Sequence, residues 1–159
     1  MDSFGKQLQN SVLAWGWAVW NVPLLAIVRP WVKELTPNQV QVLIKLRKLT
    51  KNHVGSMYMG ALVQGADLAG ALMLRAQEGP EPQNVTLIFK DIRGDFLKRA
   101  EGDTLFICKE GELIRHLLAE VARTRKRVGA TLNIEAFCLE IDDQPVAKFQ
   151  LTISLAPRK

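Results

Sequence analysis

Residues 57–74 read MYMGALVQGADLAGALML and constrain the fold more than any other part of the chain. The segment has the length of a helix and is apolar on nearly every side, and such helices are normally buried. Its strongly polar side chains are Gln64 and Asp67, which share one helical face with Gly60 at i, i+4 and i+7 spacing. A buried carboxylate is costly unless it is paired or opens onto a cleft. The pattern therefore indicates a functional site on a core helix.

The composition fits one globular domain of 159 residues, with 48% hydrophobic and 23% charged residues. The net charge of +5 favours anionic ligands, but outside residues 123–127 the basic residues are scattered, so we expect no nucleic-acid partner. That basic run is either a phosphate patch or a solvated helix end. Cys108 and Cys138 lack metal-ligand spacing and His53 and His116 are isolated. We therefore expect reduced thiols, a cytoplasmic location, no metal and no cofactor.

The N-terminal region is rich in tryptophan but unlike a membrane anchor or a signal peptide. Residues 12–28 include Trp15, Trp17 and Trp20, yet Asn21 and Pro23 interrupt them. The stretch is shorter than the roughly 20 apolar residues of a spanning helix and lacks a basic start. Apolar residues at helical spacing predict an amphipathic helix over residues 4–21. We expect it to pack on the fold or on a partner subunit, without stable membrane insertion.

The rest of the chain alternates between strand and helix patterns. Period-two alternation predicts strands, and a second amphipathic helix is expected after Gly111. The predicted strands are residues 27–35 (interrupted at Pro30), 40–47, a segment from 85 with a bulge near Asp91, 104–108, 130–138 and 147–155, the last two forming a hairpin. One antiparallel sheet with a face packed on a single apolar helix explains both patterns, which places the chain in the α+β class.

The sequence NHVGSMYMGA at residues 52–61, followed by Asp67, resembles the acyl-CoA thioesterases of the phenylacetate-pathway type. Those enzymes carry an asparagine and a glycine, then His-Gly-Gly, then a carboxylate on the central helix. Here Tyr58 and Met59 stand where the family has histidine and its first glycine, and Gly60 retains the second. The resemblance spans about residues 31–155 and implies the hotdog fold, a curved antiparallel sheet around one long helix. The whole chain looks closest to a bacterial hotdog family of largely unassigned function.

The resemblance implies a thioester hydrolase and suggests a role for several residues. The backbone N–H of Met59, with that of Gly60, would stabilise the oxyanion, and Asp67 would be the general base or nucleophile. Asn52 and Gln64 would support them. Each side chain also has a structural interpretation: Asp67 as a polar anchor, Asn52 as a turn or cap residue, and Gln64 as a partner for a strand carbonyl.

Substrate contacts are expected on both sides of the reacting group. Met57 and Tyr58 lie in the segment that would line the acyl pocket, although either could equally be packing. If the carrier is coenzyme A, its phosphates require cations, and the candidates include Arg93, Arg125 and Arg127. The acyl chain, and the choice between coenzyme A and an acyl carrier protein, are left open.

We therefore expect a single hotdog domain over residues 1–159, with an N-terminal helix at 1–22 and a central helix at 57–77. Hotdog relatives share each site between two subunits, which implies a homodimer and allows a tetramer. The alternative is a non-catalytic hotdog protein that binds acyl groups or fatty ligands in the same groove. The state of Asp67 distinguishes the two, because an enzyme needs this carboxylate open to a pocket whereas a binder can bury it.

Overall fold

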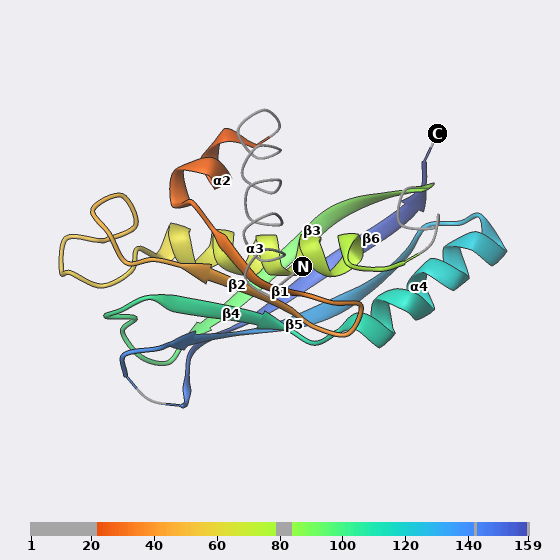
Figure 1. The fold of residues 1–159 in the computed structure, drawn as a ribbon. Helices are drawn as coiled ribbons and strands as arrows, with labels where there is room; N and C mark the ends of the chain where they lie inside the picture. The colour runs from red at the N-terminus through yellow and green to blue at the C-terminus, as the bar shows by residue number, and fades with distance from the viewer. Residues whose placement is uncertain (1–21, 79–83, 142, 159) are drawn as a thin grey trace, which may run out of the picture.

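The computed structural model of the protein describes residues 22–78, 84–141 and 143–158. The order of elements agrees with the sequence pattern, apart from a short helix that precedes the first strand (Figure 1). The elements are α2 (Pro23–Val28), β1 (Trp31–Leu35), β2 (Val40–Ile44), α3 (Met59–Arg75), β3 (Val85–Phe96), β4 (Thr104–Cys108), α4 (Gly111–Thr124), β5 (Val128–Cys138) and β6 (Pro145–Pro157).

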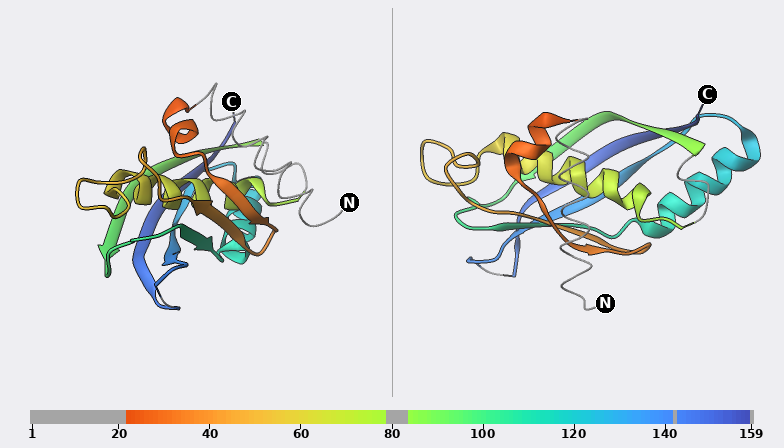
Figure 2. Two further views of the ribbon diagram at one scale, coloured as in Figure 1. Left: turned by 60° about the vertical axis from the view of Figure 1, so that its left-hand side comes forward. Right: turned by 45° about the horizontal axis from the view of Figure 1, so that its top comes forward.

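The strands form one six-stranded sheet in the order β1-β2-β4-β5-β6-β3, and every neighbouring pair is antiparallel. The sheet curves around α3, which lies along its inner face (Figure 2). Gly65 allows a close approach, because a Cβ added there would lie 2.3 Å from the ring of Phe106 on β4. One hydrophobic cluster joins side chains of α2, α3, α4 and the sheet. This is the hotdog fold, as the sequence predicted.

The period-two patterns are confirmed where the prediction was most definite. β5 and β6 pair antiparallel, and their inward residues Leu132, Ile134, Phe149 and Leu151 are buried. The expected bulge near Asp91 is present as a register shift between Phe89 and Asp91 in the pairing of β3 with β6. Cys108 and Cys138 are free, buried thiols at the ends of β4 and β5.

The expected first strand over residues 27–35 is wrong in its first part. Pro23 occupies the start of α2, where a proline costs no hydrogen bond. Arg29 then ends this helix in the left-handed conformation with φ of 49°. The strand begins only at Trp31, after Pro30. Pro30 therefore lies in the connection between helix and strand and does not make a bulge within a strand.

The central helix is slightly shorter than expected, since α3 covers Met59–Arg75 rather than residues 57–77. Met57 is held outside it by a bridge with Lys51 and by an N–H bond to Ala100 O at 2.8 Å. The predicted N-terminal helix at 1–22 falls almost wholly outside the described residues. Within the described part of the chain, no helix is long and apolar enough to cross a membrane.

α3 is not buried all round, which corrects the expectation from its composition. The face toward the sheet is buried, with Ala66 and Met73 fully inaccessible. The opposite stripe is half-exposed in the single subunit, and its members recur at helical spacing: Gly60, Val63, Gln64, Asp67 and Ala71. An apolar helix of this kind leaves one face for a second surface to cover.

Candidate functional site

The N-terminus of α3 carries backbone N–H donors that find no acceptor among the described residues. Tyr58 is the N-cap residue in an extended conformation and makes no side-chain cap. Its carbonyl accepts the N–H groups of Ala61 and Leu62, at 2.9 and 3.1 Å. Within the described residues, the N–H groups of Met59 and Gly60 have no acceptor. Two free donors and the positive end of the helix dipole make this end suited to an anionic oxygen.

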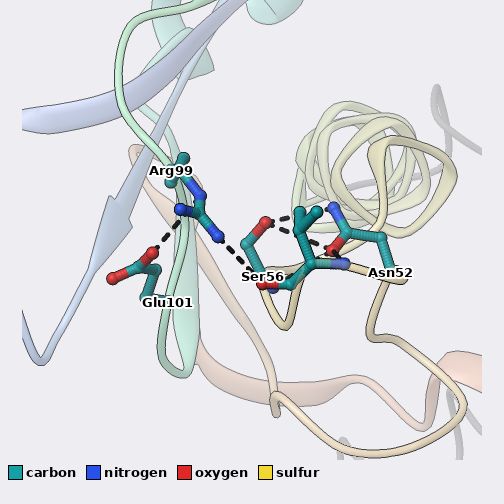
Figure 3. Close-up of polar contacts among 5 residues, drawn as sticks. Asn52, Ser56, Arg99 and Glu101 are labelled. Carbon is teal, nitrogen blue, oxygen red and sulfur yellow. Dashed lines mark hydrogen bonds and ion pairs between the residues drawn. The ribbon is translucent and has the colours of Figure 1, made fainter.

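A hydrogen-bonded loop positions this helix end (Figure 3). The Oδ1 atom of Asn52 accepts the N–H groups of Val54 and Ser56 at 3.0 and 3.1 Å, and its Nδ2 donates to Ser56 Oγ at 3.0 Å. Arg99 Nη2 donates to Val54 O at 2.8 Å and its Nε pairs with Glu101 at 3.3 Å. The structure thus directs the Asn52 side chain into the loop, in the manner of an Asx turn.

Tyr58 and Met57 take different positions beside the helix end. The Tyr58 side chain is 55% exposed, while Met57 is buried. The Tyr58 ring lies directly over Gly60, because a Cβ built on Gly60 would meet Tyr58 Cε1 at 2.5 Å. A side chain at position 60 would therefore displace this exposed ring, whereas Met57 belongs to the core.

Asp67 and Gln64 lie together on the half-exposed face of α3. They border a groove of about 490 Å³ between the helix and the sheet edge, lined also by Val63, Phe89–Ile92 and Leu151. Burial raises the pKa of the Asp67 carboxyl above its ordinary value. The Oε1 atom of Gln64 is buried and, among the described residues, finds no hydrogen-bond donor. The carboxylate is therefore open to a groove and not sealed inside the core.

The two halves of the predicted site are separated within one subunit. Met59 and Asp67 are eight residues apart on one helix, which corresponds to about 12 Å along its axis. Met59 does not line the Asp67 groove. A single carbonyl group cannot contact both, so within one chain the structure assembles Gln64 with Asp67 and leaves the helix N-terminus apart.

The predicted phosphate-binding arginines are dispersed. Arg93 pairs with Asp91 at 3.5 Å and lines a different groove, of about 650 Å³, across β3–β6. Arg127 Nη1 donates to Ser154 Oγ at 3.0 Å, and Arg125 ends α4 in the left-handed conformation. Arg93 on β3 pairs with Gln150 on β6, whereas Arg127 binds Ser154, four residues further along β6. Four strand residues span about 13 Å, so the two arginines are anchored at separate places on the sheet.

One cation at the Asp67 groove was missed by the sequence reasoning. Lys90 lies at the bulge of β3 and borders the groove together with Asp91. The predicted bulge was the available signal, since a bulge redirects side chains beside it. Within the described part of the chain, no cluster of His, Cys, Asp or Glu has the grouping of a metal site.

The curved six-stranded antiparallel sheet around α3 defines a protein of the hotdog fold. Residues 13–155 match the family described as Domain of unknown function (DUF4442), and the chain belongs to that family. No curated protein matches the chain.

Solved structures share the fold over nearly the whole chain. Pseudomonas aeruginosa PA5026, described as a protein of unknown function and "Probable Thioesterase", is 22% identical with a TM-score of 0.78, over 92% of this chain and 95% of that one. Chlorobaculum tepidum OLEI01261, of unknown function, is 13% identical with a TM-score of 0.75, over 96% and 97%. Haemophilus influenzae thioesterase HI1161 is 12% identical with a TM-score of 0.65, over 87% and 86%. At these identities the likeness shows a common fold.

Proposed function

We propose that this protein hydrolyses acyl thioesters at a site shared by two subunits. The observation that carries the proposal is that one helix bears the N–H donors of Met59 and Gly60 and, about 12 Å along its axis, the half-buried carboxyl of Asp67. Among the described residues, none of these groups has a hydrogen-bond or ion-pair partner. Two antiparallel copies of α3 would bring the N-terminus of one helix beside the Asp67 of the other. The thioesterase names of the neighbouring folds are consistent with this reaction.

The chemistry follows from the groups at such a site. Asp67 as a carboxylate takes a proton from water, and the water oxygen bonds to the thioester carbonyl carbon. The carbonyl oxygen becomes an oxyanion and accepts the N–H groups of Met59 and Gly60. Collapse of this intermediate breaks the C–S bond, and the thiolate leaves with a proton. A raised pKa brings Asp67 closer to the working pH, which makes it a stronger base.

The exposed surfaces of the subunit are suited to dimer formation. Gly60 and Ala71 keep the half-exposed face of α3 small enough for a second helix to approach. β3 is an edge strand of the sheet, and its residues Ile88, Ile92 and Phe96 are exposed. Long apolar edges of this kind invite pairing with another chain. These features support a homodimer with both helix faces and both β3 edges at the interface.

The anionic carrier requires cations at the mouth of the groove. Lys90 joins Arg93, Arg125 and Arg127 as a candidate, and it is the one that borders the Asp67 groove. If Lys90 binds a carrier phosphate, Lys90→Glu should raise KM with little change in kcat, since the phosphates are remote from the reacting carbonyl. An unchanged KM for coenzyme A esters would exclude Lys90 from carrier binding.

Two variants test the shared site. Asp67→Asn removes the base and should lower kcat by about 100-fold or more with short, long or aromatic acyl-CoAs. Met59→Pro removes one oxyanion donor at the first helical position, where proline is tolerated, and should cost about 100- to 1000-fold. The preceding residue, Tyr58, already has the extended conformation that proline requires (φ −66°, ψ 138°). Both variants should keep the fold by thermal melting.

Mixing the two inactive variants distinguishes a shared site from one within a single chain. In a mixed dimer, one site carries both defects and the other carries neither. Refolding an equal mixture should therefore restore about a quarter of the original activity, since half of random dimers are mixed. No recovery, with mixed dimers demonstrated, would place the site within one subunit. An unaltered chain that binds fatty acyl ligands but turns over none would favour the non-catalytic binder.

A further inference from the structure

A second surface lies at the end of the molecule where α3 begins, on the loop at residues 45–54 (KLRKLTKNHV). Four of these ten residues are lysine or arginine, and no aspartate or glutamate occurs between positions 35 and 66, which corrects the view that the basic residues outside 123–127 are scattered. The side chains of Lys45, Lys48 and Lys51 are exposed. Leu49, between two of these lysines, is 67% exposed, and Val54 is 54% exposed. A solvent-facing leucine framed by cations is not accounted for by packing within the subunit.

The short helix α2 extends this surface. Arg47 Nη2 donates to the carbonyl of Ile27 at 2.6 Å, which joins the loop to α2. Leu24 and Ile27 on α2 are 60% and 48% exposed. Burial lowers the pKa of Arg47, and the nearby positive charge of Arg29 lowers it further. Loop and helix together therefore present apolar side chains among cations.

The loop is held in a defined shape. Thr50 is buried and its Oγ1 donates to Lys45 O at 2.7 Å, while Leu46 N–H donates to Asp103 Oδ1 at 2.8 Å. Asp103 is thereby engaged with the backbone, and the nearby Glu101 pairs with Arg99. These two carboxylates therefore already have partners within the subunit. Leu49 is presented on a structured turn, so little ordering entropy opposes its binding to a surface.

We propose that the surface formed by residues 45–54 and α2, here called the basic tip, docks on an anionic lipid surface. Cations flanking apolar side chains are the combination that holds proteins at charged membrane interfaces, where the apolar groups enter the headgroup region. Leu49 projects outward, and a projecting side chain suits a fluid lipid layer better than a protein partner, which would need a matching pocket. The contact is reversible and interfacial, and no part of it spans the bilayer.

The location of the basic tip relates it to the rest of the protein. Lys51 forms a β-bridge with Met57, two residues before α3, so the tip adjoins the helix N-terminus. Docking would present this end of the helix to the interface. The inference goes beyond the proposed hydrolysis and stands on the charge and exposure of the tip alone. Its test uses no thioester, so the failure of one proposal leaves the other unaffected.

The test is sedimentation of the full chain with vesicles of phosphatidylcholine, alone or mixed with phosphatidylglycerol. We expect binding only to the mixed vesicles, weakening as salt rises. Each lysine near a charged surface contributes about 1 kcal/mol, a factor of about five. Lys48→Glu/Lys51→Glu should therefore weaken binding by about 30-fold or more. Leu49→Gln should weaken it by about tenfold through lost apolar burial. These side chains are exposed, so the melting temperature should stay unchanged.

Arg123→Glu/Lys126→Glu is the matched control, because it makes the same change of charge on exposed residues at the C-terminal end of α4. This control should retain most of the binding. An equal loss in control and tip variants would show a general charge effect and overturn the proposal. Undiminished binding of the tip variants would place the contact elsewhere on the chain and also overturn it. Absence of binding by the unaltered chain would do the same, and capture on an immobilised acidic carrier protein would then assign the tip to protein docking.

Discussion

Gly65→Ala tests how closely α3 must lie on the sheet. An added Cβ would stand 2.3 Å from Phe106 Cε2 and 2.4 Å from Cζ, whereas ordinary carbon contacts are about 3.5 Å or more. Either α3 or the ring of Phe106 must therefore move by about 1 Å to restore an ordinary contact distance. Phe106 is fully buried, so any shift of its ring must displace close-packed neighbours in the core. Overpacking of this kind costs about 1–3 kcal/mol, against a gain of up to about 1 kcal/mol in helix propensity.

Subtracting the gain from the cost leaves a net loss of up to about 2 kcal/mol, or up to about 6 °C in melting temperature for a chain of this size. Gly70→Ala is the matched control on the same helix. Its nearest neighbour is the flexible end of Leu151, at 3.0 Å, so helix propensity should dominate and the melting temperature should hold or rise. Calorimetry on both variants decides the question. A Gly65→Ala protein as stable as Gly70→Ala would refute the tight contact with Phe106.

Three further predictions address the site. Burial raises the pKa of Asp67 in the folded protein above its unfolded value, so ionisation of this carboxyl opposes folding as pH rises through these two values. Asp67→Asn should therefore be more stable than the parent at pH 7. Urea titrations should show this difference in stability vanishing below about pH 4, where the carboxyl is protonated. A less stable Asp67→Asn at pH 7 would show that the carboxylate has a stabilising partner. Asn52→Ala removes the side-chain hydrogen bonds that hold the loop and should cost about 1–3 kcal/mol by denaturant unfolding, whereas an unchanged midpoint would deny Asn52 this structural role. Ala71→Arg, on the half-exposed face of α3, should convert the proposed dimer into folded monomers by sedimentation; a persistent dimer would mean another interface.

Local patterns were enough to predict much of the architecture. Period-two alternation predicted β5 and β6 and their pairing, and the break in alternation near Asp91 predicted the bulge in β3. The i, i+4 and i+7 spacing placed Gly60, Gln64 and Asp67 on one helical face, and all three lie on the half-exposed stripe. These inferences succeed because strand and helix periods are properties of the backbone over a few residues, and distant contacts do not change them.

The tertiary structure decided what depends on neighbours distant in sequence. Composition predicted a fully buried α3, but burial depends on what covers each face, and the sheet covers only one. Residues 27 and 28, predicted as the start of a strand, instead complete a helix that begins at Pro23 and ends in the left-handed conformation at Arg29. Loop geometry sets the direction of the Asn52 side chain. Sheet register disperses the arginines and places Lys90 at the groove. Sequence spacing specifies which residues share an element, whereas packing between elements determines which of them meet.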